Sequence, residues 1–190
     1  MVKDFTDKQK SKTYLYLIRH TRLNIEPGIC YGQSDVDVYP LFEKKAEKIS
    51  KRLRKIKFDQ IYSSPLQRCS KLAQVLSNGQ EIIFDNRLKE INFGDWEMKR
   101  WKDIADETKE VFRNYNFTTP CPNGESFIDL KRRVNDFLTE IKKTSRHSDI
   151  CIVTHGGPIR AFISIIKNKE PLKLFQRKVD YGAIIKLELN

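Results

Sequence analysis

Short apolar strands alternate with amphipathic helices along this chain, and that alternation restricts its fold more than any other feature. Residues 13–18 (TYLYLI) are rich in β-branched and aromatic side chains, which predicts a strand. Residues 41–56 carry apolar side chains at helical spacing, and residues 125–143 repeat the pattern over a longer stripe. An order of this kind favours a parallel sheet covered by helices.

The rest of the chain follows the same order, with one interruption. We expect further strands at 59–62, 80–84, 150–154 and 182–189, and further helices at 63–76 and 158–167. The first of these helices is expected to start at Ser63-Ser64-Pro65, since serine caps helices and proline fits the first turn. The predicted fold class is α/β, a three-layer α/β/α sandwich with a mainly parallel central sheet. Residues 92–123 break the alternation and are predicted to form a lid excursion.

The length and the polar N-terminus favour one domain with a short tail. A chain of 190 residues can bury a sizeable core, and it contains no repeat, low-complexity tract or linker. We therefore expect a single domain over residues 13–190 and a flexible tail over residues 1–12. No apolar run approaches the roughly 20 residues that cross a bilayer. The N-terminus has no apolar segment of the kind found in secretory signals.

The four cysteines are scattered, and none belongs to a CxxC pair. They are Cys30, Cys69, Cys121 and Cys151. Their spacing predicts no metal site and no redox motif. We expect free thiols in a reducing cytoplasm, and no metal or other cofactor.

The formal net charge of +11 indicates an anionic partner or simply a basic surface. The lysines are spread along the predicted helices and form no concentrated run with interleaved aromatic residues. This distribution favours a solvated basic surface over a nucleic-acid groove, and we expect neither nucleic acid nor membrane as a partner. A small anionic substrate is the expected partner, and the sequence predicts no particular oligomeric state.

Charged and imidazole side chains follow four of the predicted strands. Arg19 and His20 follow the first, Arg68 lies one helical turn after the second, Glu90 comes after the third and His155 after the fourth. In open α/β sheets, ligands bind beyond the carboxyl ends of the strands. We therefore expect these five residues to converge at one edge of the sheet.

Such a set can perform phosphoryl transfer without a metal. Two guanidinium groups bind phosphate oxygens, and the glycines after His155 at a helix N-terminus add N–H donors. A neutral imidazole can attack phosphorus, and a second imidazole can donate a hydrogen bond to the phosphoryl oxygens. A carboxylic acid can then protonate the leaving alkoxide.

Each residue alone also has a structural interpretation. An Arg-His pair at a strand end, a helix arginine and a solvated glutamate are all common, and only their combined order favours a function. A zinc site of His20, Glu90 and His155 is the competing chemistry, but two arginines in the same pocket disfavour a dication. His147 lies in a polar stretch and receives no role.

The same residues resemble the motifs of the histidine phosphatase (phosphoglycerate mutase-like) superfamily. The matching segments are LIRHT at 17–21, YSSPLQRC at 62–69, LKEINFGDWE at 88–97, PNGES at 122–126 and VTHGG at 153–157. They occur in the family's order from about Tyr14 to Arg160. The resemblance implies that His20 is the phosphoryl-accepting nucleophile and Glu90 the proton donor. It also implies that Arg19, Arg68 and His155 form the phosphate pocket.

Two positions depart from the family pattern. Thr21 stands where the family has glycine, and its hydroxyl is a candidate ligand for phosphate. Met98 also replaces a glycine, which puts the local turn in doubt but not the chemistry. Asn24, Gln33 and Gly156 complete the candidate substrate-binding residues.

Residues 28–37 (GICYGQSDVD) resemble the CYGxxD stretch of α-ribazole phosphatases. This resemblance implies hydrolysis of α-ribazole-5′-phosphate in cobalamin biosynthesis. A phosphoglycerate mutase-like enzyme or a sugar-bisphosphate phosphatase is the alternative within the superfamily. A phosphate- or partner-binding module with little turnover is the alternative from another class.

The predicted excursion is rich in aromatic residues, any of which could stack on a benzimidazole-like base. They are Trp96, Trp101, Phe112, Tyr115 and Phe117. For any single one of them, packing of the excursion onto the sheet is the favoured interpretation.

Overall fold

The computed structural model describes residues 12–104, 106, 117–145 and 147–189, and a five-stranded mixed sheet lies at its centre. The strand order is β3-β2-β4-β1-β5. The strands are β1 (Thr13–Arg19), β2 (Gln60–Ser63), β3 (Ile83–Phe84), β4 (Asp149–Thr154) and β5 (Ile184–Leu189). Parallel pairing joins β1, β2, β3 and β4, and only β5 runs antiparallel, against β1. The predicted α/β class with a mainly parallel sheet is confirmed.

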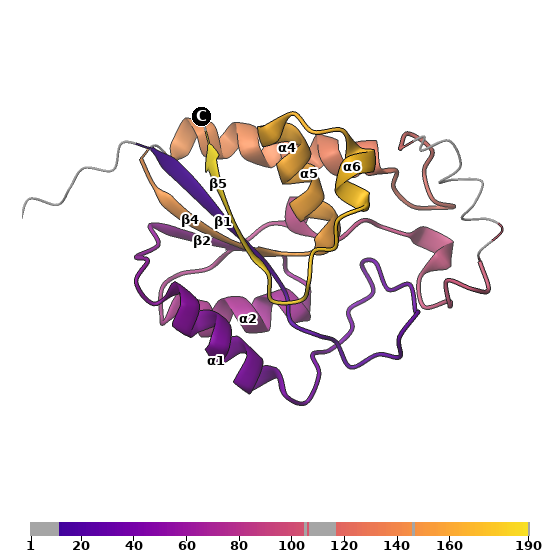
Figure 1. Ribbon diagram of the computed structural model, residues 1–190, viewed down its shortest axis with the longest axis horizontal. Helices are drawn as coiled ribbons and strands as arrows, with labels where there is room; N and C mark the ends of the chain where they lie inside the picture. Colours follow the sequence, from indigo (N-terminus) through magenta and orange to yellow (C-terminus); the bar gives the residue numbers. More distant parts are fainter. Residues whose placement is uncertain (1–11, 105, 107–116, 146, 190) are drawn as a thin grey trace, which may run out of the picture.

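Helices cover both faces of the sheet, as Figure 1 shows. On one face lie α1 (Phe42–Leu53) and α2 (Gln67–Ser77). On the other lie α4 (Phe127–Thr144), α5 (Gly156–Lys167) and the short α6 (Pro171–Phe175). Of these three helices, only α6 was not predicted from the sequence. Within the described residues, no helix is both long enough and apolar enough to cross a membrane.

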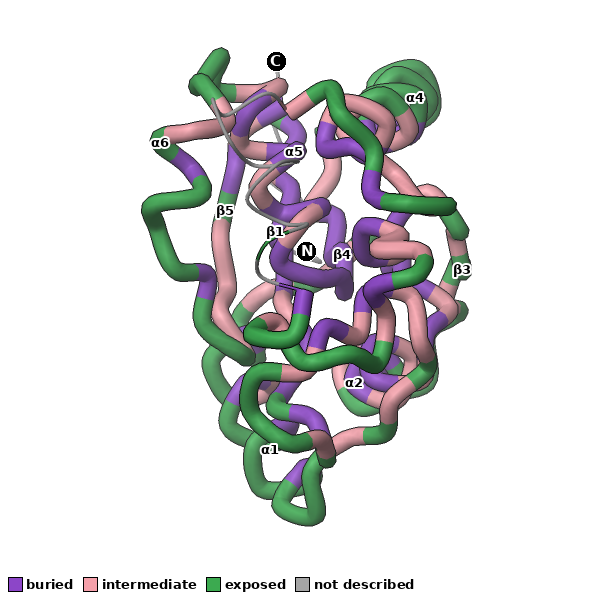
Figure 2. Tube along the Cα trace, turned by 90° about the vertical axis from the view of Figure 1, so that its right-hand side faces the viewer, coloured by how far each residue is buried: buried purple, intermediate pink, exposed green. Residues whose placement is uncertain are grey.

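The two helical layers produce two apolar cores, and β1 supplies both. Leu15 and Leu17 pack into the core beneath α4 and α5, while Tyr16 and Ile18 pack beneath α1 and α2. Figure 2 shows β1 and β4 as largely buried strands inside the molecule. Burial on both faces explains why these strands read as unbroken apolar runs rather than alternating ones.

Several helix starts differ from the prediction, and a hydrogen bond to His155 explains one of these differences. The predicted serine cap at 63–64 is wrong: Ser63 ends β2, and α2 begins at Gln67 with no side-chain cap at Leu66. The Ser64 hydroxyl instead bonds the imidazole of His155. α5 begins at Gly156 rather than at residue 158. α4 begins after Ser126, whose hydroxyl forms a capping box with Asp129.

The described parts of the excursion, residues 92–104 and 117–123, lie at one end of the sheet (Figure 1). Trp96 is fully buried there, in a small cluster with Cys30, Ile104 and Cys121 that is separate from the two sheet cores. The favoured packing onto the sheet therefore does not hold for Trp96. Phe117 does pack against the α4–α5 core. Phe112 and Tyr115 lie outside the described residues, as does nearly all of the predicted tail.

The turn at Met98 has a left-handed backbone although the residue is not glycine. Met98 has a φ of 65°, its side chain is 55% exposed, and its N–H donates to the Cys30 carbonyl. A left-handed backbone costs a residue with a β-carbon about 1–2 kcal/mol, and glycine avoids this cost at the expense of greater chain entropy.

We predict that Met98→Gly raises the free energy of unfolding by about 1 kcal/mol, because it removes the left-handed strain. Urea denaturation measures the change. Lys99→Gly is the matched control: Lys99 is exposed and is not among the positive-φ residues, so glycine should destabilise there. Equal destabilisation by both substitutions would contradict the prediction that the backbone at Met98 is strained.

Candidate active site

The carboxyl ends of β1, β2 and β4 bring the predicted charged residues together. The strand register places Arg19 opposite Thr154 and Ser63 opposite Val153, so His20, Ser64 and His155 leave the sheet at the same edge. The imidazole centroids of His20 and His155 are 5.0 Å apart. Arg68, on the first turn of α2, donates from Nε to Nδ1 of His155 at 3.2 Å.

His20 is held in one tautomer by the backbone carbonyl of the next residue, Thr21. Nδ1 is 2.8 Å from the carbonyl oxygen of Thr21, which can only accept, so the ring proton lies on Nδ1. Nε2 then carries a free lone pair, and it is buried without a partner among the described residues. Burial, followed by the charges of Arg68 and Arg19, holds the pKa of His20 well below its ordinary 6.5. The ring is neutral near neutral pH, as attack on phosphorus requires.

His155 is fixed on both ring nitrogens. Because Nδ1 accepts from Arg68, Nε2 carries the proton and donates to the Ser64 hydroxyl at 2.8 Å. The thiol of Cys69 lies 3.4 Å from the same Nε2. Burial and the neighbouring His20 and Arg68 hold the pKa of His155 well below 6.5. A ligand would have to share this N–H with Ser64 to receive a hydrogen bond from it.

Arg68 is fully buried and anchors a loop of the site. Its Nη1 and Nη2 donate to the carbonyls of Ser34 and Gly32 at 2.8 Å and 2.6 Å. That loop is in turn held by Glu97, whose carboxylate accepts from the backbone N–H of Gln33 and of Ser34. A β-carbon on Gly32 would lie 2.1 Å from Glu97 Oε1, so only glycine allows this approach.

Arg19 lies between two tyrosines from distant parts of the chain. Its guanidinium carbon is 4.1 Å from the ring centre of Tyr181, and its Nη2 donates to the Tyr31 hydroxyl at 3.4 Å. The two tyrosine hydroxyls are 3.1 Å apart. Nη1 donates to the carbonyl of Val179, and Nε is buried without a partner among the described residues. Arg19 therefore keeps a donor for an anion.

Glu90 is buried at the N-terminus of α5. Its Oε1 accepts from the N–H groups of Gly157 and Ile91 at 3.0 Å and 2.9 Å. A β-carbon on Gly157 would lie 2.1 Å from that oxygen, which explains the glycine. The carbonyl of Glu90 accepts from Gln33 and Arg133, so the loop that carries the carboxylate is also fixed.

The four predicted substrate-binding residues fall into different places. Thr21 is buried, and its hydroxyl has no partner among the described residues. A β-carbon built on Gly156 would lie 3.6 Å from the guanidinium carbon of Arg19, so Gly156 lies beside that guanidinium group. Gln33 bonds the Glu90 carbonyl rather than pointing freely into the site. Asn24 is exposed, and its backbone N–H bonds Asp37.

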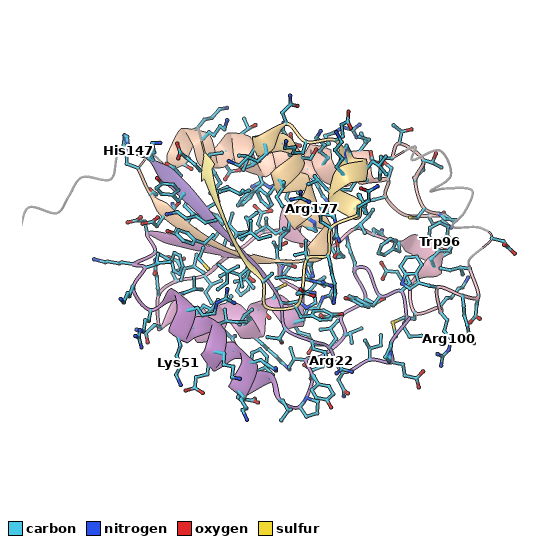
Figure 3. The ribbon with its side chains drawn as sticks, in the orientation of Figure 1. Arg22, Lys51, Trp96, Arg100, His147 and Arg177 are labelled. Carbon is cyan, nitrogen blue, oxygen red and sulfur yellow. The ribbon has the colours of Figure 1, made fainter. Side chains whose placement is uncertain are left out.

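Sequence reasoning missed Ser64, Tyr31, Tyr181 and Glu97. Ser64 belongs to a segment that was predicted only to start a helix. Glu97 belongs to a motif that was used only for the family resemblance. Tyr31 and Tyr181 lie 150 positions apart, and no local pattern joins them. His147 lies far from Trp96 (Figure 3), and it precedes β4, whereas His155 follows the carboxyl end of that strand.

The described residues contain no cluster of three or more His, Cys, Asp or Glu side chains spaced to hold a metal ion. The donors gathered here are guanidinium N–H groups, backbone N–H groups and imidazoles, which suit an anion. An open α/β sheet with these donors and two imidazoles at its carboxyl edge has the arrangement that suits the binding of a phosphate group.

Comparison with known proteins gives the same result. The family model described as the histidine phosphatase superfamily (branch 1) matches residues 15–190, and this chain belongs to that superfamily as a phosphatase. A relative from Hydrogenobacter thermophilus, named putative phosphoserine phosphatase 2, is 32% identical and covers 93% of this chain and 89% of its own. The adenosylcobalamin/alpha-ribazole phosphatase of Escherichia coli K12 is 25% identical, covering 93% and 90%.

The fold matches solved structures equally well. The crystal structure of a putative alpha-ribazole-5′-P phosphatase from Escherichia coli superimposes with a TM-score of 0.82 at 23% identity, covering 94% of this chain and 91% of that one. At this level of identity the match shows the shared fold.

We predict that both buried histidines titrate below pH 6.5, the ordinary value. Below that pH the unfolded chain binds more protons than the folded one, so the free energy of unfolding falls as the pH falls through this window. NMR titration of the imidazole Cε1 protons measures both values, with His147→Ala used to assign the third resonance. A His20 resonance that titrates at or above 6.5 would contradict this electrostatic description.

Proposed function

We propose that residues 13–190 act as a single domain that hydrolyses phosphate monoesters through a phosphohistidine on His20. The unprotonated Nε2 of His20, which has no partner among the described residues, is the observation that carries the proposal. A buried lone pair without a partner is costly, and a phosphoryl group at this place would relieve that cost. Arg19 Nε, which the described residues also leave without a partner, supplies a donor beside it.

The two chemical steps follow from these groups. His20 Nε2 attacks phosphorus, the ester P–O bond breaks, and protonated Glu90 gives its proton to the leaving alkoxide. Water then attacks phosphorus, the P–N bond breaks, and the Glu90 carboxylate takes the proton of the water. Arg19, Arg68 and the N–H of His155 stabilise the charge on the phosphoryl oxygens in both steps. Thr21, Gly156, Gln33 and Asn24 are kept as proposed substrate contacts.

For the substrate we propose α-ribazole-5′-phosphate. The stretch 28–37 supports it, because this stretch resembles that of α-ribazole phosphatases and supplies Tyr31 and the two carbonyls that hold Arg68. The relative from Escherichia coli K12 that is named for this activity supports it as well. Cobalamin biosynthesis would then be the process served.

Phosphoserine is the second candidate substrate, because the relative with 32% identity is named for it. The phosphoglycerate mutase and sugar-bisphosphate activities remain alternatives from the sequence. A panel of α-ribazole-5′-phosphate, phosphoserine, fructose bisphosphate and 3-phosphoglycerate with catalytic 2,3-bisphosphoglycerate separates these functions by kcat/KM. A module without turnover would release no burst of phosphate under single-turnover conditions.

We also propose that the protein works in the cytoplasm. All four cysteines are free and buried, and burial raises the pKa of the Cys30 thiol to about 12. Thiols with such pKa values stay protonated and react slowly. Disulfide-linked, oxidised material recovered from cells would contradict this proposal.

We predict that His20→Ala lowers kcat on 4-nitrophenyl phosphate by more than about a thousandfold, because His20 supplies the imidazole nitrogen that has no partner among the described residues of the site. His147→Ala, which changes a histidine far from the site, should retain wild-type activity. Excess EDTA should leave the wild-type rate unchanged. Wild-type turnover by His20→Ala would remove His20 from the mechanism, and EDTA inhibition would support the zinc interpretation.

Glu90→Gln removes the transferable proton but keeps the size of the side chain. We predict a loss of about 10²–10⁴-fold in kcat/KM for alkyl phosphates, whose leaving alkoxide needs a proton, and a much smaller loss for 4-nitrophenyl phosphate. Glu47→Gln on the surface of α1 is the control. An equal loss for both substrate types would argue against the acid role of Glu90.

A further inference from the structure

A cavity of about 320 Å³ opens beside Glu90, on the side of the sheet that carries α4, α5 and α6. Glu90 and Gly157 form its catalytic end, where the carboxylate meets the N-terminus of α5. Five aromatic side chains are among the residues that line the rest of the cavity: Phe93, Trp101, Phe117, Phe127 and Phe175. The elements that contribute them come together at one end of the molecule (Figure 1).

These aromatic walls hold each other in place. Phe93 packs edge-on against Trp101 with ring centroids 5.2 Å apart. Phe175 stacks on Phe117 at 5.2 Å and meets Phe127 edge-on at 5.0 Å. A cavity whose walls are fixed by such pairs offers preformed aromatic surfaces to a ligand.

The polar groups of the lining are largely committed to the protein. The Ser126 hydroxyl caps α4, and the Glu125 carboxylate forms an ion pair with Arg133 and accepts from the N–H of Asn92. A ligand in the cavity would therefore contact mainly apolar faces. A dry cavity of about 150 Å³ accommodates one benzene ring, so the present volume suits a ring system of about two fused rings.

We propose that this cavity binds the leaving group of the substrate and selects a neutral, aromatic group of two rings. The inference rests on the proposed phosphatase function, since it places the ester oxygen at Glu90 and the ring system among the five aromatic residues. Burial of the rings holds the ester in register with the acid, which raises kcat/KM for aromatic substrates over small ones.

Arg160 defines the competing possibility. It also lines the cavity, and its three nitrogens donate to the carbonyls of Gly156, Leu174 and Arg177. Its guanidinium lies 5.3 Å from the ring centre of Phe175. A carboxylate on the leaving group could pair with Arg160, and the enzyme would then prefer phosphoserine to an aromatic ester.

The test compares primary alkyl phosphates whose leaving groups differ mainly in bulk and charge. The probes are ethyl phosphate, 2-(1-naphthyl)ethyl phosphate and phosphoserine. We expect kcat/KM for the naphthyl ester to exceed that for ethyl phosphate by at least about tenfold, and to exceed that for phosphoserine. The whole 190-residue chain is used, and 4-nitrophenyl phosphate reports the chemical step in every sample.

Two variants then connect the preference to the cavity. Phe175→Ala and Trp101→Ala should each lower the naphthyl-to-ethyl ratio of kcat/KM by about three- to tenfold, because each removes one aromatic contact with the ring. Phe84→Ala is the matched control, since Phe84 is 50% exposed, Phe175 is 42% exposed, and Phe84 is not among the residues that line the cavity. Phe84→Ala should leave the ratio unchanged, and circular dichroism checks that each variant folds.

The outcomes separate the inference from the proposed function. Loss of the naphthyl preference in both cavity variants supports the inference. Equal kcat/KM for all three esters, or a preference for phosphoserine, overturns it while His20-dependent hydrolysis of 4-nitrophenyl phosphate stands. Absence of that hydrolysis in the wild type overturns the proposed function itself.

Discussion

The buried guanidinium of Arg68 is the constraint on which the rest of the site depends. A charge without solvent is costly unless hydrogen bonds and opposite charge compensate for it. Arg68 finds two carbonyls, from Gly32 and Ser34, and the imidazole of His155. These three bonds fix the tautomer of His155 and the position of the loop, but they bring no negative charge. A phosphoryl dianion would supply the missing charge, so this environment favours binding of an anion.

The parallel sheet makes this arrangement possible. β1, β2 and β4 end at the same edge of the sheet. Residues that are far apart in the sequence therefore lie close together there. Apolar packing on both faces holds the strands in register, since β1 places alternate residues in two cores. The imidazoles at the strand ends are then buried by the fold itself. That burial lowers their pKa and keeps the His20 ring neutral.

The sequence predicted the sheet, most helices and the convergence of five side chains at one edge of the sheet, because each of these leaves a local pattern or a motif. The sequence did not predict the roles of side chains that contact residues far away along the chain. Ser64 has the sequence of a helix cap, yet its hydroxyl bonds His155 from across the sheet. Tyr31 and Tyr181 surround Arg19 only after folding, and Met98 accepts a left-handed turn because the Cys30 carbonyl holds its N–H. The aromatic cavity draws its walls from separate elements, so spacing along the chain could not reveal it.

The position of the phosphoryl group during turnover tests the account most directly. The protein is mixed with ³²P-labelled substrate, quenched in base within one turnover, digested and mapped by mass spectrometry, with NMR used to identify the phosphorylated ring nitrogen. The account predicts label on His20 at Nε2, because Nδ1 holds the proton that bonds the Thr21 carbonyl. Label on His155, on another side chain or on no residue of an actively hydrolysing enzyme would contradict it.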